Sequence, residues 1–152
     1  MMNLKTKITQ IHYQRDPEGF LFDILKFCSY FYAFGSRLKN FCYDKGLIKP
    51  KRVNAYVISV GNMTTGGVGK TPVVSEIAKY LVNQGFKVAI LSRGYGGRLD
   101  NKNVNMISDG QSIYFDAIQA GDEPYWLAEN TPGCYVFTCK NRYLAGKYAV
   151  EK

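Results

Sequence analysis

Histidine and close cysteine pairs are scarce in this chain of 152 residues. His12 is the single histidine, and no two cysteines form a C-x-x-C pair. The cysteines stand at Cys28, Cys42, Cys134 and Cys139. Because zinc sites use closely spaced Cys and His ligands, the sequence gives zinc little support. The N-terminal MMNLKTKITQ also lacks the apolar segment of a signal peptide, so we expect a reduced, cytosolic setting with no disulfide partner.

Acidic residues are outnumbered: 12 Asp and Glu stand against 20 Lys and Arg, a formal net charge of +8. This excess indicates an anionic partner, which could be nucleic acid, anionic lipid or a phosphorylated substrate, although a generally basic surface would have the same composition. With 46% hydrophobic residues, a disordered chain is excluded. The length suits one domain with its own core, or a piece of a larger one.

A hydrophobic run long enough to span a bilayer is also missing. Residues 20–34, FLFDILKFCSYFYAF, are apolar almost all round a helix, with a narrow polar stripe at Asp23, Lys26 and Ser29. The run is shorter than the about 20 residues that a transmembrane helix needs, and it carries two charges. We therefore predict a buried or interfacial helix.

A basic segment follows this run, in which Asp44 is the only acidic residue. Its cations are Arg37, Lys39, Lys45, Lys49, Lys51 and Arg52. An aromatic helix followed by basic residues favours an anionic membrane surface, through apolar insertion and charge. Packing against the rest of the protein, with the lysines solvated, explains the same residues. We predict an N-terminal lead-in and membrane-associating segment over residues 1–52 and a second domain over residues 53–152.

The second domain shows the pattern of an α/β fold. The apolar run AYVISV (55–60), an amphipathic helix (70–84) and the apolar run FKVAILS (86–92) predict a right-handed β-α-β unit. Residues 104–108 and 112–115 predict a hairpin or two short strands, residues 134–139 a further core strand, and helices should begin near residues 122 and 141. We expect a mostly parallel sheet flanked by helices.

The stretch GNMTTGGVGKTPVV (61–74) has the composition of a phosphate-binding loop between a strand and a helix. Glycines let backbone N–H groups converge on phosphate oxygens, and the helix N-terminus favours negative charge. Lys70 would reach the β- and γ-phosphates, and the Thr71 hydroxyl would bind Mg²⁺. Thr64 replaces the first glycine of the usual pattern, which indicates an unusual loop shape. The expected nucleotide contacts are Thr64, Thr65, Gly66, Gly67, Val68, Gly69, Lys70 and Thr71.

Two further motifs follow the predicted strands. SRGYGGR (92–98) lies at the end of the second strand, where Arg93 and Arg98 could bind phosphate; an ordinary surface loop is the alternative. AGDEPYWLAEN (120–130) places Asp122 and Glu123 at a helix start. These carboxylates could act near a γ-phosphate, orienting or deprotonating an attacking hydroxyl. The helix dipole alone would also favour acidic residues there, and spacing does not decide between the two.

Together these motifs resemble the tetraacyldisaccharide 4′-kinase family, the lipid A 4′-kinases of Gram-negative bacteria. That family shows GNxTxGGxGKTP, SRGYGG and GDEP in this order, and they stand here at Gly61–Pro72, Ser92–Gly97 and Gly121–Pro124. The resemblance covers nearly the whole chain. It implies a P-loop NTPase-like fold, with ATP and Mg²⁺ as cofactors. The implied reaction transfers the γ-phosphoryl group to the 4′-hydroxyl of tetraacyldisaccharide 1-phosphate, at the cytoplasmic face of the inner membrane.

The resemblance also implies residue roles. Asp122 matches the family's catalytic carboxylate, Lys70 and Thr71 serve the phosphates and Mg²⁺, and Glu123 supports the metal or its waters. Arg93 and Arg98 would contact anionic substrate or nucleotide. The family's later DDGFQH-like segment and a more C-terminal histidine have no counterpart here. We therefore expect the N-terminal part of such a kinase, unable to turn over by itself.

Two other classes compete with this interpretation. Partner-switching ATPases with a deviant phosphate loop read KGGVGKT, but this chain has Thr65 where that lysine stands, and they would not explain SRGYGG or GDEP. A nucleic-acid-binding module would rest on the net charge alone, without a recognition motif. We expect no nucleic-acid partner.

Overall fold

The computed structural model describes residues 19–61 and 69–152. The chain divides into two compact units, Met1–Pro50 and Lys51–Lys152. In the first, the helix α2 covers Phe20–Asp44 and buries none of its residues. It is longer than the 15-residue run because the following residues, such as Leu38 and Lys39, are good helix formers. It ends two residues before Gly46, whose positive φ of 70° suits glycine after a helix. No helix of the described residues combines the length and the apolar character needed to cross a membrane.

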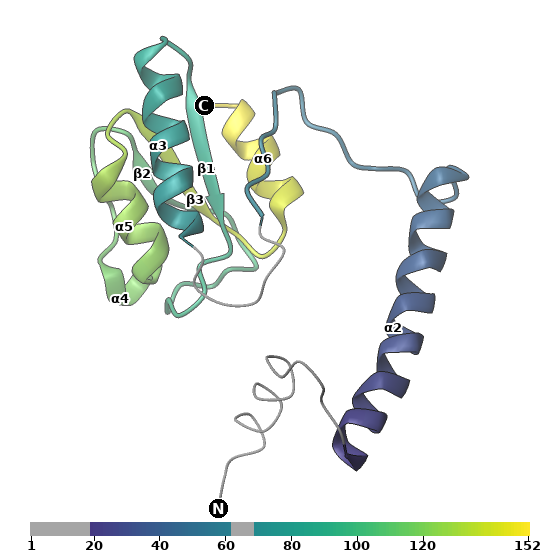
Figure 1. Ribbon diagram of the computed structural model, residues 1–152. Helices are drawn as coiled ribbons and strands as arrows, with labels where there is room; N and C mark the ends of the chain where they lie inside the picture. Colours follow the sequence, from purple (N-terminus) through teal and green to yellow (C-terminus); the bar gives the residue numbers. More distant parts are fainter. Residues whose placement is uncertain (1–18, 62–68) are drawn as a thin grey trace, which may run out of the picture. The chain divides into compact units, whose positions relative to one another are not determined.

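The second unit contains a three-stranded mixed sheet (Figure 1). Its strands are β1 (Val88–Ser92), β2 (Asn105–Asp109) and β3 (Cys134–Thr138), in the order β1-β3-β2. β1 and β3 are parallel, in a register that runs from Val88 opposite Cys134 to Ser92 opposite Thr138. β2 is antiparallel to β3. The prediction of a mostly parallel sheet is therefore wrong for the described residues, because β2 joins β3 in the opposite direction.

Helices cover both faces of this sheet (Figure 1). They are α3 (Lys70–Asn83), the short α4 (Ala117–Ala120), α5 (Asp122–Asn130) and α6 (Arg142–Val150). On one face, Ala78 of α3 and Leu127 of α5 share a buried core with Val136 of β3. The next residue of β3, Phe137, points to the other face, where its ring packs edge-on against Tyr148 of α6 with 5.6 Å between centroids. Alternation along β3 thus gives one core to each layer of helices.

The helix and strand predictions from residue 70 onward are largely confirmed. The helix at 70–84 ends one residue earlier, and the strands at 86–92 and 134–139 are each trimmed to five residues. The alternative of a hairpin is supported at 104–115, where a bridge between Ser108 and Ile113 closes a turn after β2. The carboxylate of Asp109 accepts hydrogen bonds from the Tyr114 hydroxyl and from the backbone N–H groups of Ser112 and Gln111 in this turn. The Tyr114 bond first, and then the two backbone bonds, lower the pKa of Asp109 to about 2.

The predicted strand at 55–60 is wrong. Residues 55–60 form no strand, and the side chains of Tyr56, Val57 and Ile58 are 105%, 74% and 61% exposed. A strand is stable only where a neighbouring strand accepts its backbone hydrogen bonds, and the described sheet pairs only β1 with β3 and β3 with β2. The expected β-α-β unit around α3 therefore lacks its first strand here.

Candidate active site

The candidate site lies where β1 and β3 end. Because the two strands are parallel, their carboxyl ends meet at one edge of the sheet, and the N–H of Cys139 donates to the carbonyl of Ser92 just beyond them at 3.1 Å. Ligands of open α/β sheets bind beyond such ends. The motifs SRGYGGR and AGDEPYWLAEN and the start of α3 all contribute residues to this region.

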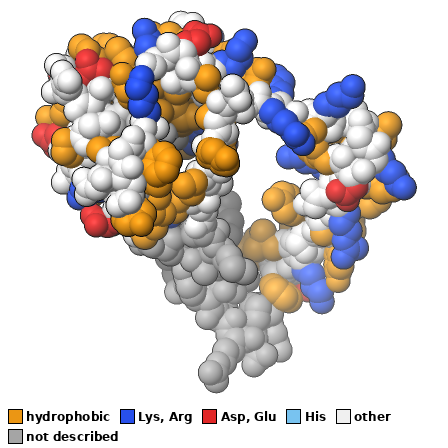
Figure 2. All heavy atoms as spheres, turned by 90° about the horizontal axis from the view of Figure 1, so that it is seen from above, with side chains coloured by type: hydrophobic (Ala, Val, Ile, Leu, Met, Phe, Trp, Pro, Cys, Tyr) orange, Lys and Arg blue, Asp and Glu red, His pale blue; other side chains and the backbone are white. Residues whose placement is uncertain are grey.

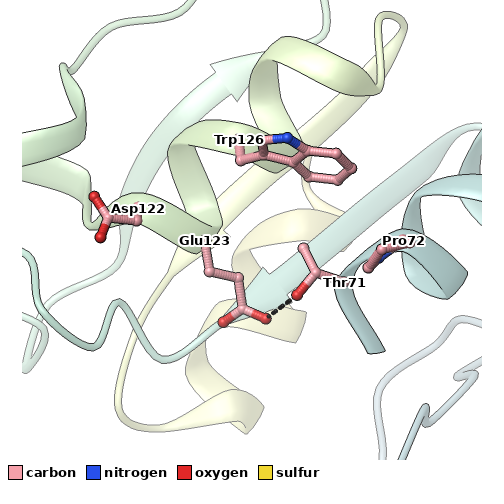
Figure 3. A pocket seen from close by; sticks show the side chains of 5 residues that line it. All are labelled: Thr71, Pro72, Asp122, Glu123 and Trp126. Atoms are coloured by element: carbon pink, nitrogen blue, oxygen red, sulfur yellow. Dashed lines mark hydrogen bonds between the residues drawn. The ribbon is translucent and has the colours of Figure 1, made fainter. Parts of the chain in front are cut away.

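Glu123 accepts side-chain hydrogen bonds from two other elements of the site. Its Oε1 accepts a hydrogen bond from the hydroxyl of Thr71 at 3.1 Å, and its Oε2 accepts one from the hydroxyl of Ser92 at 3.3 Å. Thr71 is the second residue of α3, Ser92 the last of β1, and Glu123 the second of α5. The structure thus joins the phosphate-loop helix to the GDEP motif through side chains, as Figure 3 shows for Thr71 and Glu123.

An open pocket of about 400 Å³ lies beside this contact. It is lined by Thr71, Pro72, Asp122, Glu123 and Trp126. Figure 3 shows the indole of Trp126 above the Thr71–Glu123 contact, while the carboxylate of Asp122 points away from that of Glu123. The neighbouring carboxylates therefore face different directions, and Asp122 is left exposed at the pocket.

The SRGYGG and GDEP loops pack against each other through glycine. A Cβ atom at Gly97 would lie 2.6 Å from the backbone carbon of Ala120, and one at Gly121 would lie 2.7 Å from the carbonyl oxygen of Tyr95. The N–H groups of Arg98 and Leu99 donate to the carbonyl of Gln119 at 3.0 and 3.1 Å. The backbones of the two loops are therefore in close contact, and this contact fixes the start of α5, which carries Asp122 and Glu123.

We expect Gly97→Ala to lower the free energy of unfolding by about 1–3 kcal/mol or more, because the added methyl group meets backbone atoms of the neighbouring loop that cannot move aside easily. Urea unfolding followed by the fluorescence of Trp126, the single tryptophan of the chain, measures the change. Gly61→Ala is the matched control, since a Cβ there meets nothing within 4 Å. Equal stability of the two variants would show that the loops are free to separate.

The two predicted arginines differ in their surroundings. The guanidinium of Arg93 lies over the ring of Tyr95, 5.7 Å from its centroid, and donates to the Tyr95 hydroxyl at 2.6 Å. The guanidinium of Arg98 is exposed, and within the described residues Arg98 is held through its backbone N–H. The structure therefore orders the Arg93 side chain beside the strand end and leaves that of Arg98 in solvent.

Arg142 is a basic residue of this region that the sequence did not single out. It begins α6, directly beyond β3. Partial burial lowers the pKa of Arg142, and the like charge of Arg93 lowers it further, while Tyr95, Glu123 and Cys139 oppose this effect. Arg93 directly follows β1 and Arg142 begins α6 just beyond β3, so both cations lie past the carboxyl ends of these parallel strands, where their charge favours an anion.

The remaining predicted nucleotide contacts are only partly described. Thr64, Thr65, Gly66, Gly67 and Val68 lie outside the described residues. Gly69 precedes α3 with a φ of 73°, a left-handed conformation that favours glycine, and Lys70 is the first residue of that helix. The predicted helix start after the glycine-rich stretch is therefore confirmed, and it places Thr71 against Glu123.

Sequence reasoning missed Ser92 and Trp126 as well as Arg142. Ser92 lies within the SRGYGGR motif, in which the arginines were the predicted site residues. Its position as the last residue of a predicted strand could have indicated a role in the site, because ligands bind beyond the carboxyl ends of such strands. Trp126 follows Asp122 by four residues, which puts both on one face of α5.

The donor set suits Mg²⁺ held together with phosphate. No group of three or more His, Cys, Asp or Glu residues among those described could hold a metal alone. The pocket supplies one hydroxyl and two carboxylates. Mg²⁺ prefers oxygen ligands, keeps several waters and uses few protein ligands where substrate phosphates complete its shell. Thr71 and a neighbouring carboxylate therefore fit such an ion.

Fold and site together define an α/β protein with helices on both faces of a small mixed sheet and, at the strand ends, a pocket whose lining includes one hydroxyl and two carboxylates. The family model described as LpxK, tetraacyldisaccharide-1-P 4'-kinase, matches residues 21–152. The chain therefore belongs to the tetraacyldisaccharide-1-P 4'-kinase family.

Individual relatives agree with this assignment. A tetraacyldisaccharide 4'-kinase of Desulfotalea psychrophila is 51% identical over 121 residues, which are 80% of this chain and 34% of that protein. Another from Pelobacter propionicus is 43% identical over 136 residues, 90% of this chain and 37% of that protein. The chain thus spans about a third of the length of these relatives.

A solved structure has the same fold. The crystal structure of LpxK from Aquifex aeolicus in complex with ATP matches with a TM-score of 0.75 and 38% sequence identity, over 88% of this chain and 41% of that one. These matches favour the kinase interpretation over the partner-switching ATPase.

Proposed function

We propose that this chain provides the ATP-binding part of a lipid kinase that phosphorylates the 4′-hydroxyl of tetraacyldisaccharide 1-phosphate. The carrying observation is the Thr71–Glu123 hydrogen bond, which joins the phosphate-loop helix to the GDEP motif in a chain of this kinase family. The crystallisation of the related LpxK with ATP supports the nucleotide. A P-loop NTPase-like fold, with residues 64–71 around the phosphates, is part of the proposal.

In this mechanism, the N-terminus of α3 and the ammonium of Lys70 attract the β- and γ-phosphates. Mg²⁺, when bound, neutralises phosphate charge, and Thr71 and Glu123 are the residues that would hold it or its waters. Asp122, exposed at the pocket, accepts the proton of the acceptor 4′-hydroxyl as its oxygen bonds to the γ-phosphorus. The bond between that phosphorus and the bridging oxygen of ADP breaks, so the phosphoryl group moves to the sugar.

The arginines contribute positive charge around the acceptor. Arg93, ordered by Tyr95, would contact an anionic group of the substrate or nucleotide, and Arg98 would add exposed charge nearby. Planar guanidinium groups suit phosphate because they offer several donors in a fixed geometry.

We further propose that residues 1–52 associate with the cytoplasmic face of a bacterial inner membrane, as a peripheral or monotopic protein. α2 exposes a large set of apolar side chains: Phe20, Phe27, Tyr30, Phe31, Tyr32, Phe34, Leu38 and Phe41. Figure 2 shows hydrophobic and basic side chains interspersed on the surface of the molecule. A helix of this kind binds an anionic bilayer by apolar insertion together with charge attraction.

Replacing both Phe31 and Phe34 with serine should weaken binding to vesicles of phosphatidylglycerol by about tenfold or more, because two apolar rings no longer insert. Co-sedimentation at low and high salt measures this. The double variant Tyr80→Ser and Phe86→Ser is the control, since it removes two exposed aromatic rings from the second unit. Unchanged sedimentation of the α2 variant would contradict the membrane role of this helix.

The kinase proposal is tested with the complete gene product, labelled ATP and tetraacyldisaccharide 1-phosphate. Transfer of label to the lipid, with the phosphate on the 4′-hydroxyl, is expected. ATP hydrolysis without lipid labelling would contradict the proposal and restore the ATPase alternative, and salt-sensitive binding to DNA exceeding that to anionic vesicles would favour a nucleic-acid partner.

A further inference from the structure

Ser92 occupies a buried position at the end of β1. It is 7% exposed, and its carbonyl accepts the N–H of Cys139 at 3.1 Å, which extends the β1–β3 pairing by one bond. Its hydroxyl donates to Oε2 of Glu123 at 3.3 Å and lies 3.5 Å from the N–H of Gly94, which donates to it. Ser92, at the buried end of β1, therefore holds Oε2 of Glu123, which belongs to α5.

Glu123 needs such an anchor. It lies in the first turn of α5 and is exposed, and a free glutamate side chain has several rotatable bonds and loses considerable rotamer entropy when it is ordered. The Ser92 bond holds Oε2, so that Oε1 remains directed at Thr71, 3.1 Å away. Two hydrogen bonds thus connect Ser92 of the sheet to Glu123, and Glu123 to Thr71 of α3.

The direction of the Thr71–Glu123 bond has a chemical consequence. Thr71 donates its only hydroxyl hydrogen to Glu123, so the lone pairs of its Oγ1 are left to face a cation. If the carboxylate of Glu123 moved away, the Thr71 hydroxyl could rotate. A metal ion would then bind only after both side chains had been ordered again.

We propose that Ser92 is a positioning residue: it holds Glu123 so that the Thr71 hydroxyl presents its lone pairs to the metal ion that accompanies ATP. This inference rests on the proposed function, which assigns the metal to Thr71. It gives the serine of SRGYGG a role separate from that of the arginines in the same loop.

Ser92→Ala in the complete gene product tests the inference. Calorimetric titration should show ATP binding weakened about tenfold when Mg²⁺ is present, since a hydrogen bond to a charged group is lost, and changed less than about twofold when EDTA removes the metal. The Mg²⁺ concentration for half-maximal kinase activity should rise similarly. Ser92→Thr, which retains the hydroxyl, should recover most of the loss.

Ser108→Ala is a closely matched control. Ser108 is 2% exposed, lies in β2, and its hydroxyl accepts the N–H of the glycine two residues later, Gly110, at 3.0 Å. It therefore reproduces the burial and local hydrogen bond of Ser92 without the carboxylate. Its binding of ATP should be the same as that of the unmodified protein in both buffers.

A double-variant cycle with Glu123→Gln separates positioning from general packing. If Ser92 acts through Glu123, Ser92→Ala should add almost nothing in the Glu123→Gln background. Additive effects, or an equal loss with and without Mg²⁺, would overturn the inference. Failure of the unmodified protein to label the lipid would instead contradict the proposed function, and the metal-dependent binding comparison would still report on Ser92.

Discussion

Asp122→Asn should lower kcat for phosphoryl transfer to tetraacyldisaccharide 1-phosphate by about 10²–10⁴-fold, the usual range for a general base. ATP affinity should stay within about twofold, because the carboxylate of Asp122 points away from Glu123, which contacts Thr71 (Figure 3). Asparagine has nearly the same shape as aspartate but cannot accept the proton of the 4′-hydroxyl. Initial rates with saturating ATP and lipid, together with an ATP titration, check both halves of this prediction.

The alternative explanation of Asp122 is the helix dipole. Asp122 is the first residue of α5, where a negative charge contributes about 0.3–1 kcal/mol to helix stability. A purely structural role therefore predicts a small loss of stability with near-normal turnover. Glu129→Gln, at the other end of the same helix, controls for the loss of one charge. Near-normal turnover in Asp122→Asn would remove Asp122 from the mechanism.

Lys70→Ala should lower kcat/KM for ATP by about 10²–10³-fold, comparable to the loss of a single preorganised donor to a transition state. Lys70 is the first residue of α3, and the proposal places its ammonium on the β- and γ-phosphates. Unlike Asp122→Asn, this change should also weaken ATP binding, because the phosphates carry charge in the ground state. Steady-state kinetics and ATP titration distinguish the two variants.

Lys79→Ala is the matched control for Lys70. Lys79 lies on the same helix and pairs with Glu76 at 3.0 Å on the surface, so its removal takes away one positive charge without approaching the pocket. Exposed pairs of this kind contribute at most about 1 kcal/mol, and activity should be retained. A similar loss in both lysine variants would indicate that Lys70 acts through general charge only.

The elements from residue 70 onward were predictable because their signals are local. The helical spacing after the glycine-rich stretch and the apolar runs before residues 93 and 140 led to α3, β1 and β3. The run AYVISV carries an equally apolar signal, yet it forms no strand. Its side chains suit a strand, but strand formation also requires a hydrogen-bonding neighbour, and a sequence pattern does not reveal which segments pair. The direction of β2 was beyond local signals for the same reason.

For the candidate site too, the sequence predicted some residues but not the contacts between them. The order of the three motifs indicated the family, and the family resemblance in turn predicted site residues: Lys70, Thr71, Asp122, Glu123 and Arg93. The motifs did not show that Glu123, and not Asp122, contacts Thr71. Nor did they show Ser92 as the anchor of Glu123, or Arg142 as a second cation beyond the strand ends.

By itself, the sequence determined which residue types occur in which motifs, where α3, β1, α5 and β3 form, and which family the chain resembles. Only the tertiary structure decided which of these residues meet. Thr71 and Ser92 lie 52 and 31 positions from Glu123, and they come together because α3, β1 and α5 pack around one core. Local patterns depend on neighbours within a few residues, whereas these contacts depend on how separate elements share buried surface.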